Sequence, residues 1–525
     1  MKEKKGLSLI DWWVVVPVAV ILIPLIIYGF ISPSGLAAAA SAVFDFSIDK
    51  FGALMLIGPF LLVIFCVGIM FTKWGDIKIG GKDAKPEMDR FSWFSVALTT
   101  CIGIGLVYYG TYEPLNFYVN TPSFLGIGAG TPEAAESWGY IFMHWLITPY
   151  SLYTAGGLCL TLMVHHARRK DKYSSGMYPL FGKKVDGRLG SIIDAFALLV
   201  TFGGLCASIG VAALQLTGGA GFITGQNFST SLAYIIVIAI VTGLCLVTTS
   251  TGLKKGMTYL SKINVYLFFA LLAGVMILGH TTFQFDSMTN ALGYYLDRFV
   301  KISLYTEPAQ KTGWVGSWTI FFNAWYLVCT PVFGTFLVKL AKGRTIREFI
   351  AVNLIGPSIF IFLWFGAFGS EAIYIQMNGI GDLAGMLETY GASVANFALA
   401  DFLPLSGFFK VGGLIAVFLS FATCMQSQIL AIADSCTTLG AESSSPISLR
   451  IFWGLVSGAL GLVVLLAGDY DALQSILVAL GPIALILMLL SAAAFIKSLV
   501  QRRRYDLVLL EELGEAAPDA EVPAD

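Results

Sequence analysis

The sequence has little charge. Of its 525 residues, 12% are charged and 57% are hydrophobic, whereas an ordinary soluble domain carries about 25% charged residues. The formal net charge of −1 provides no excess of basic residues for binding a nucleic acid. A soluble fold could not hide this much apolar surface. The composition therefore predicts an integral membrane protein of about twelve helices, each of which needs about 20 apolar residues.

Metal-binding and catalytic motifs are also absent from the sequence. The eight cysteines form no CxxC pair, and two of the four histidines, His165 and His166, are adjacent in a basic loop. We interpret the cysteines as small buried hydrophobic residues and expect no metal and no organic cofactor. No constellation of His, Asp and Glu falls within an apolar stretch, so we expect no enzymatic activity.

Apolar runs alternate with polar loops along the whole chain. The first run has no small-residue cleavage site, so we interpret it as a retained helix rather than a signal peptide. We predict twelve transmembrane helices, at about residues 11–32, 52–72, 93–111, 136–164, 189–217, 228–250, 257–279, 315–341, 347–376, 406–436, 449–467 and 473–497.

Lysine and arginine are distributed unevenly between the loops. If the N-terminus lies inside, 27 of the 32 basic residues fall in inner segments and 5 in outer segments. Basic residues concentrate in the cytoplasmic loops of membrane proteins. The sequence therefore predicts a multi-pass protein of the cell membrane with both termini in the cytoplasm.

Three segments lie outside the predicted spans and have distinct compositions. Residues 280–314 and 377–405 have patterns typical of amphipathic helices at the membrane interface. Residues 511–525 are acidic and rich in alanine and proline. We expect this last segment to be disordered.

Span 3 contains a glycine cluster at residues 100–106. Small residues within a span favour close packing between helices. Glycines can also interrupt a membrane helix where its backbone lines a binding site. The glycine cluster alone leaves both interpretations open.

Aromatic residues gather deep within spans 4 and 8. Tyr150 and Tyr153 are three residues apart and share a helix face, and Trp145 lies about two turns before Tyr153. Trp325 and Tyr326 lie far from the span ends, where interfacial anchors are found. Aromatic faces in such positions can hold a cation, especially a quaternary ammonium, by cation–π attraction.

Charged residues fall in or beside the spans at Glu113, Lys262 and Asp434. An ionisable group buried in a membrane indicates a functional site. A charged residue at the end of a helix can instead reach the interface. The sequence leaves the two interpretations open for all three residues.

These features occur together in one known family. Over most of its length the sequence resembles the betaine/choline/carnitine transporter (BCCT) family. The motifs that carry the resemblance occur in the family's order: Gly103-Ile104-Gly105-Leu106, Tyr109-Gly110, Glu113-Pro114-Leu115, His144-Trp145, Pro149, Trp318-Thr319, Ala324-Trp325, Pro331, Gly334, the segment from Lys342 to Phe349, and Ala433-Asp434-Ser435.

The resemblance implies an all-α integral membrane fold of the leucine-transporter type. Spans 3–7 and 8–12 would be two inverted five-helix repeats. The implied partners are the lipid bilayer, a small zwitterionic or cationic solute and further copies of the chain in a homotrimer, and the implied mechanism is secondary transport by alternating access. The expected parts are 1–92 (N-terminal tail and two leading helices), 93–279 (first repeat), 280–314 (outer amphipathic segment), 315–497 (second repeat) and 498–525 (cytoplasmic tail).

The resemblance also implies a substrate site, formed by Cys101, Gly103 and Gly105 of span 3, Trp145, Tyr150 and Tyr153 of span 4, and Trp325, Tyr326 and Cys329 of span 8. Members of the family usually have tryptophan where Tyr326 and Cys329 stand, and often where Tyr150 stands. The expected aromatic cage is therefore smaller and more polar. A less alkylated substrate or a sulfonium zwitterion becomes a candidate beside betaine, choline and carnitine.

Ion coupling is the second point at which the sequence departs from the family. Sodium-coupled relatives carry a Thr-Ser pair where Ala431 and Ile432 stand, and these two side chains offer no oxygen ligand. Thr201 keeps one hydroxyl. Lys262 lies near the place where sodium-independent relatives carry a fixed positive charge, although Asn264 matches that position better. We expect sodium-independent exchange or facilitated transport, with sodium-coupled symport as the alternative.

A membrane solute sensor is the alternative from another functional class. Sensors usually carry a soluble output domain, and the sequence between the predicted spans contains none. We therefore expect a transporter.

Overall fold

The computed structural model describes residues 9–101, 103–250, 254–438 and 445–515, and this part of the chain is almost entirely helical. Apolar segments form helices because a helix satisfies its own backbone hydrogen bonds where no water is present. The main helices are α1 (Trp12–Ile31), α2 (Pro33–Phe71), α3 (Arg90–Cys101), α4 (Gly103–Val119), α6 (Phe142–Trp145), α7 (Ile147–Thr161), α9 (Arg188–Thr224), α10 (Ser231–Ser250), α11 (Lys254–Leu278), α12 (Thr281–Ser303), α13 (Phe321–Leu340), α15 (Gly356–Met377), α18 (Ser406–Ser435) and α19 (Ile447–Val500).

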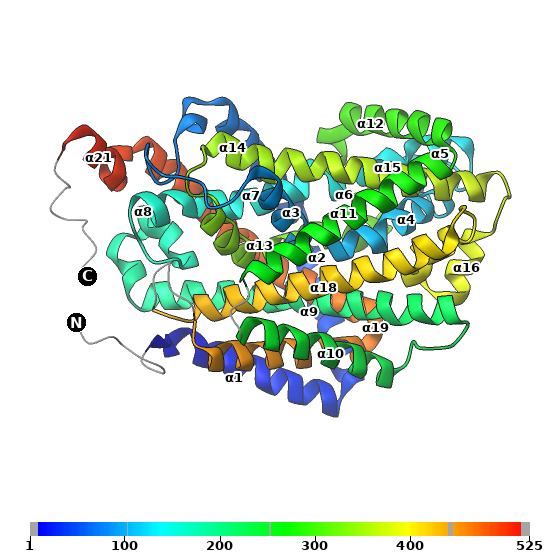
Figure 1. The fold of residues 1–525 in the computed structure, drawn as a ribbon, viewed down its shortest axis with the longest axis horizontal. Helices are drawn as coiled ribbons and strands as arrows, with labels where there is room; N and C mark the ends of the chain where they lie inside the picture. The colour runs from blue at the N-terminus through cyan, green and yellow to red at the C-terminus, as the bar shows by residue number, and fades with distance from the viewer. Residues whose placement is uncertain (1–8, 102, 251–253, 439–444, 516–525) are drawn as a thin grey trace.

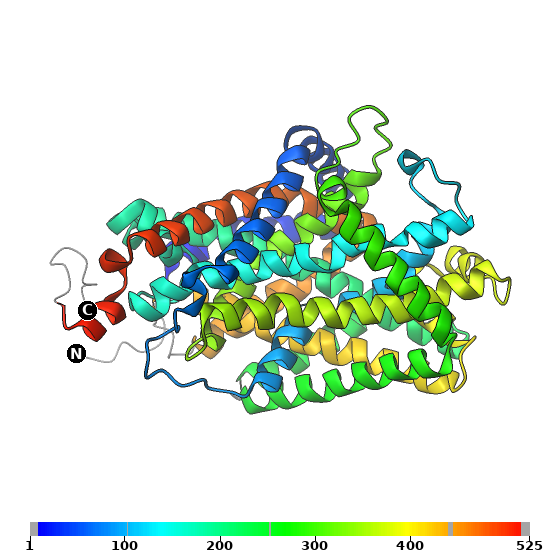
Figure 2. The same cartoon turned by 90° about the horizontal axis from the view of Figure 1, so that it is seen from above.

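Within the described residues, eleven helices are long and apolar enough to cross a membrane, or twelve if the bent pair α3 and α4 is one span. Most of them run roughly along the long axis of the molecule (Figures 1 and 2). The all-helical membrane fold with about twelve spans is confirmed. Two boundaries differ from the prediction, because α2 begins at Pro33 and the last two spans are both contained in α19.

The two predicted repeats pack in an exchanged pattern. Spans 3, 4 and 5 of the first half are α4, α7 and α9, and their counterparts in the second half are α13, α15 and α18. α4 packs against α15 as α13 packs against α7, and α4 packs against α18 as α13 packs against α9. The first helix of each half therefore packs against the second and third helices of the other half. Two inverted five-helix repeats predict this pattern.

Two spans are interrupted inside the bundle. α3 and α4 meet at 63°, and α4 begins at Gly103 within the glycine cluster, whose residue 102 lies outside the described residues. In span 4, Leu146 has a ψ of −111° between α6 and α7. Pro149 lacks the N–H that would bond to the carbonyl of Trp145, which explains this second interruption.

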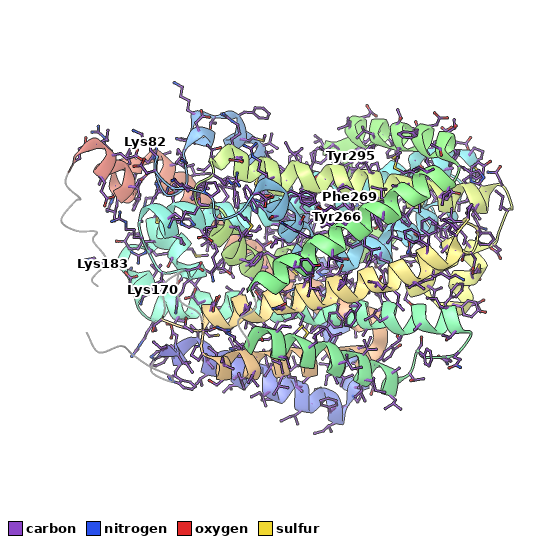
Figure 3. All side chains as sticks on the ribbon, viewed as in Figure 1. Lys82, Lys170, Lys183, Tyr266, Phe269 and Tyr295 are labelled. Carbon is purple, nitrogen blue, oxygen red and sulfur yellow. The ribbon has the colours of Figure 1, made fainter. Side chains whose placement is uncertain are left out.

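The two ends of the bundle carry different segments. The predicted outer helix is present as α12, and residues 377–405 include α16 (Leu383–Tyr390) and α17 (Ala395–Ala400). α12 and α16 lie at one end of the bundle, and α21 (Leu507–Leu513) lies at the other (Figure 1). Lys82, Lys170 and Lys183 lie at the same end as α21 (Figure 3). We refer to this as the inner end.

The C-terminal segment is more structured than the sequence predicts. α21 includes the first three residues of the 511–525 segment, and residues 516–525 lie outside the described ones. Asp506 accepts a hydrogen bond from the Leu509 N–H and so caps the helix. Arg168 forms an ion pair with Glu511. The composition does not predict this helix, because the contacts that hold it come from the loops after spans 2 and 4.

Candidate functional site

A cavity lies between helices of both halves. Seven of the nine residues predicted for the substrate site line it. The structure therefore brings together side chains that are more than 200 residues apart in the sequence. The lining residues are Gly103, Ile104 and Gly105 of α4, Trp145 of α6, Tyr153 of α7, Ser208 of α9, Trp325, Tyr326 and Cys329 of α13, and Cys424 of α18.

The aromatic side chains of the cavity pack edge to face. The ring of Tyr326 lies 5.3 Å from that of Tyr153 at 73° and 6.3 Å from that of Trp145 at 89°. Trp325 packs against Tyr109 with ring centroids 5.9 Å apart. Edge-to-face packing is favourable for aromatic pairs. It fixes four rings around a space in which a cation would meet their electron-rich surfaces.

Gly103 explains how α4 comes so close to α18. A Cβ atom on Gly103 would lie 2.4 Å from the Oγ of Ser420, so no larger residue fits without movement. Gly103 is also the first residue of α4 and lines the cavity. Close packing and an interrupted span therefore occur together at Gly103.

Two predicted site residues are not among those that line the cavity. Tyr150 is buried, with its ring 6.3 Å from that of Tyr153. Cys101 ends α3, and its side chain lies outside the described part of the structure. Ser208 and Cys424 do line the cavity but were not predicted. A single small polar residue inside an apolar span gives no distinguishing signal in the sequence.

A second cavity lies between α9, α13 and α18, and two of the predicted ion-coupling residues, Thr201 and Ile432, line it. Thr201, Thr335 and Ser435 each donate a hydrogen bond to a carbonyl of their own helix, so each hydroxyl oxygen keeps acceptor capacity. Its lining residues are Tyr173, Asp194, Ala197, Leu198, Thr201, Pro331, Val332, Thr335, Ile432 and Ser435.

The other two predicted ion-coupling residues lie elsewhere. The Nζ of Lys262 is 3.9 Å from the carboxylate of Asp89, and both side chains are partly exposed. Ala431 is buried on α18 and is not among the residues that line the second cavity. Asn264, which matches the relatives' positive residue better, is buried and donates to Ser420 Oγ at 2.8 Å. A neutral amide therefore stands beside the start of α4.

Glu113 is the centre of a buried hydrogen-bond network beside the first cavity. Its Oε1 lies 2.6 Å from His144 Nδ1, and its Oε2 accepts a hydrogen bond from the indole N–H of Trp145. His144 Nε2 lies 2.9 Å from the hydroxyl of Thr319. Glu113 is 2% exposed. This burial excludes the interpretation of Glu113 as a residue that reaches the membrane interface.

Asp434 belongs to an ion-pair network at the inner end. Lys339 Nζ lies 2.9 Å from Asp434 and 3.1 Å from Asp171. Burial raises the pKa of the Asp171 carboxyl above its ordinary value, and the charge of Lys339 opposes that rise. Lys339 thus links the end of span 8 to the end of span 10 and to the loop after span 4.

Comparisons with known proteins agree on one family. The family model described as "BCCT, betaine/carnitine/choline family transporter" matches residues 13–504. The chain is 32% identical over 499 residues to the glycine betaine transporter OpuD of Bacillus subtilis (strain 168), covering 94% of each chain.

Two further similarities were found. The chain is 31% identical over 465 residues to the osmo-independent choline transporter BetT1 of Acinetobacter baylyi (strain ATCC 33305 / BD413 / ADP1), covering 86% of this chain and 88% of the relative. Among solved structures, the substrate-bound outward-open state of a Na⁺-coupled sialic acid symporter is similar with a TM-score of 0.42 and 14% identity, covering 89% and 87% of the two chains.

Proposed function

The chain belongs to the betaine/carnitine/choline family of transporters, and from this premise we propose that it moves a betaine-like solute across the cell membrane by alternating access. Members of the family are transporters and not enzymes. The proposed solute is a quaternary ammonium compound or a related zwitterion. The named relatives differ in solute, since one is a glycine betaine transporter and another a choline transporter.

The observation that carries this proposal is the aromatic lining of the first cavity. Trp145, Tyr153, Trp325 and Tyr326 surround it, and none of its lining residues is charged. A methylated ammonium group makes no strong hydrogen bonds and is attracted by aromatic faces within about 6 Å. An uncharged aromatic cavity selects for such a group over a small, strongly hydrated cation.

The start of α4 supports the binding of a carboxylate at the other end of the solute. The first N–H groups of a helix have no partner within the helix and carry the positive end of its dipole. α4 begins at Gly103, which lines the cavity, and continues for 17 residues. A zwitterion would place its ammonium group on the rings and its carboxylate at these N–H groups.

The arrangement of the two halves supports alternating access. The cavity lies where helices of the first half pack against helices of the second half. A site at the interface of two inverted repeats can open to one side or the other as one part rocks against the other. The interruptions of spans 3 and 4 lie beside it.

A binding and uptake experiment tests the substrate class. We expect purified protein in proteoliposomes to take up glycine betaine, carnitine or choline, and Trp325→Ala to abolish this uptake. Trp13→Ala provides a matched control, because Trp13 is 68% exposed on α1 and does not line the cavity. Full uptake by Trp325→Ala, or wild-type protein that responds to no trimethylammonium compound, would contradict the proposal.

We propose further that transport does not depend on sodium and proceeds by exchange or facilitated movement. Sodium prefers oxygen ligands, and the side chains of Ala431 and Ile432 offer none. Lys262 does not supply a substitute charge at the second cavity, so this proposal depends on the missing ligands alone. Equal uptake after replacement of sodium by potassium would support it.

Sodium-coupled symport remains the second candidate, and the second cavity favours it. The hydroxyl oxygens of Thr201, Thr335 and Ser435 and the Asp194 carboxylate lie along that cavity, and a cation with oxygen ligands could use them. If sodium replacement lowers uptake, Thr201→Val and Thr335→Val should lower the apparent affinity for sodium. Sodium-independent uptake would eliminate this candidate.

The proposed assembly and orientation follow from the family and from the basic loops. We propose a homotrimer with both termini in the cytoplasm and with the repeat boundaries given above. Cross-linking in membranes would test the trimer, and labelling of single cysteines placed in the 72–90 and 304–314 loops would test the orientation. Reaction of the 72–90 loop from outside intact cells would contradict it.

A further inference from the structure

The strongest unassigned feature is a pair of ionisable side chains buried beside the first cavity. Glu113 of α4 and His144 of α6 lie 2.6 Å apart, with side chains 3% and 0% exposed. A charged group within a membrane is costly and is kept mainly where it serves a function. No lysine or arginine of the described residues pairs with Glu113, so His144 is its basic partner.

Thr319 lets this pair hold one proton more or one proton fewer. When the histidine is neutral, Nδ1–H donates to the Glu113 carboxylate and Nε2 can accept from the Thr319 hydroxyl, 2.9 Å away. When the histidine is protonated, Nε2–H can donate to the same hydroxyl, because a hydroxyl both donates and accepts. Both protonation states therefore fit without movement of heavy atoms.

Trp145 connects this pair directly to the first cavity. Its indole N–H donates to Glu113 Oε2, and its ring lines the cavity. A carboxylate that accepts from the indole N–H increases the electron density of the ring when the pair has a net negative charge. A cation on that ring is then attracted more strongly. Binding of the cation to the ring should therefore weaken binding of the extra proton to the pair, and the reverse.

The other titratable groups around the pair are tyrosines and two more distant carboxylates. Tyrosines face it from its own helix and from the helices packed against it, and an ordinary tyrosine pKa is about 10. Two carboxylates, Asp471 and Glu307, act on these tyrosines from farther away. Histidine is the side chain that ordinarily titrates between about pH 5 and pH 8. The facing tyrosines are Tyr109, Tyr112, Tyr140, Tyr326 and Tyr470.

We propose that Glu113 and His144 form a proton-binding site that is linked through Trp145 to occupancy of the cavity, so that a bound cation favours release of one proton. The inference rests on the proposed function, because it requires a cationic solute in the cavity. Linkage is reciprocal. Solute affinity should therefore fall on acidification by the same factor by which the solute lowers proton affinity.

Calorimetry on the purified full chain tests this inference. Choline and glycine betaine are titrated between about pH 5 and pH 8, in phosphate and in Tris, which differ in ionisation enthalpy. We expect binding to release up to one proton and apparent affinity to weaken by at most about tenfold per pH unit on acidification. Glu113→Gln should bind more weakly at high pH, with a flat pH profile and no proton release.

A second carboxylate–histidine pair, in which the carboxylate is buried and the histidine is partly exposed, supplies a control. His280 Nδ1 lies 2.8 Å from Glu371, at the junction of α12 with α15 and away from the first cavity. Glu371→Gln makes the same chemical change and should keep the pH dependence of the wild type. Loss of proton release in Glu371→Gln but not in Glu113→Gln would overturn the assignment.

The wild-type measurement keeps the inference testable even if the variants do not fold. Binding of choline or glycine betaine with equal heats in the two buffers and no dependence on pH would overturn the proton site alone. Binding of neither of these solutes nor of carnitine at any pH would overturn the proposed function and this inference together. Proton release by wild-type protein that disappears in Glu113→Gln and in His144→Gln would support it.

Discussion

The first cavity and the inner end of the bundle are stabilised by different interactions. The cavity is lined by aromatic rings, glycines, one serine, one isoleucine and two cysteines, with no charged side chain. The inner end contains linked ion pairs, in which Lys172 pairs with Asp11 and Asp194, and Lys339 with Asp171 and Asp434. Spans 8 and 10 contribute to both regions.

This difference indicates how each region responds to a substitution. Close packing of rings and backbone is lost with small displacements, so the shape of the cavity depends on each lining side chain. The ion pairs of the inner end are largely buried, so removing one partner leaves a charge without compensation. We therefore expect substitutions in the cavity to change recognition of the solute, and substitutions at the inner end to change stability and rate. Four predictions test this distinction.

The largest effect is expected at Gly103. In Gly103→Ala the new Cβ would lie 2.4 Å from Ser420 Oγ, so α4 or α18 must move. Overpacking of this kind costs about 1–3 kcal/mol. If the substitution destabilises the conformation that binds the solute by this amount, the solute affinity measured by calorimetry should drop about tenfold to a hundredfold.

Gly68→Ala is the matched control, because an added Cβ on this exposed glycine of α2 meets nothing within 4 Å. The double variant Gly103→Ala with Ser420→Gly should regain part of the affinity, since the clashing atoms are then absent. Affinity in Gly103→Ala equal to that of the wild type would show that the cavity is not held by this close contact.

A smaller effect is expected from Tyr326, whose ring contacts both Tyr153 and Trp145. Tyr326→Leu removes one aromatic face, and a cation–π contact in a dry site contributes about 0.5–2 kcal/mol. The affinity for glycine betaine should fall about twofold to thirtyfold. Tyr326→Phe keeps the ring and should change the affinity less than Tyr326→Leu does. An equal loss in both variants would assign the contribution to the hydroxyl instead.

At the inner end, Lys339→Gln removes the charge shared by Asp171 and Asp434. Two carboxylates then face each other without a cation, and the loss should lower the free energy of unfolding by about 1–3 kcal/mol. Thermal unfolding in detergent measures this, and Lys339→Arg is the control that keeps the charge. Solute affinity should stay unchanged. A Lys339→Gln protein with normal stability but weak binding would reverse the distinction between the two regions.

The sequence was sufficient to predict the spans and most of the cavity residues, but not the side-chain contacts between spans. Periodic apolar runs predict spans, because each helix satisfies its own backbone. The motifs shared with the family placed Trp145, Tyr153, Trp325 and Tyr326 in one site, and the structure brings their side chains together. Neither the apolar runs nor the family motifs predicted that Ser208 and Cys424 line the cavity, because this depends only on which helix face points toward it.

Long-range polar contacts were the least predictable part. The pairing of Glu113 with His144 joins two spans through side chains that could equally have faced the interface. Lys262 is a second case: its position in the sequence is near that of an ion-substituting charge in relatives, and in the structure its side chain pairs with Asp89. The direction in which a side chain points around a helix decides both cases. One sequence with weak amphipathicity does not determine that direction.

The smallest effect is expected from the segment that docks at the inner end. Burial would raise the pKa of Asp506, but hydrogen bonds and the charge of His166 outweigh it and lower the pKa below the ordinary value. A carboxyl with a lowered pKa stabilises the docked form above its unfolded pKa of about 3.9, and this stabilisation is lost as the pH falls through the lower, folded value.

Docking of α21 should therefore be constant near neutral pH and weaken below about pH 4. A spin label at Leu513→Cys, an exposed position at the end of α21, would report this as increased mobility. Asp506→Asn keeps a side-chain acceptor for the cap but loses the charge, so docking of α21 should weaken by about 1 kcal/mol. The spin label should therefore be more mobile in this variant, and its mobility should not change on acidification. Glu515→Gln removes a carboxylate from an exposed ion pair and should behave as the wild type. If Glu515→Gln abolishes the acid response instead, the exposed pair rather than Asp506 holds the segment at the inner end.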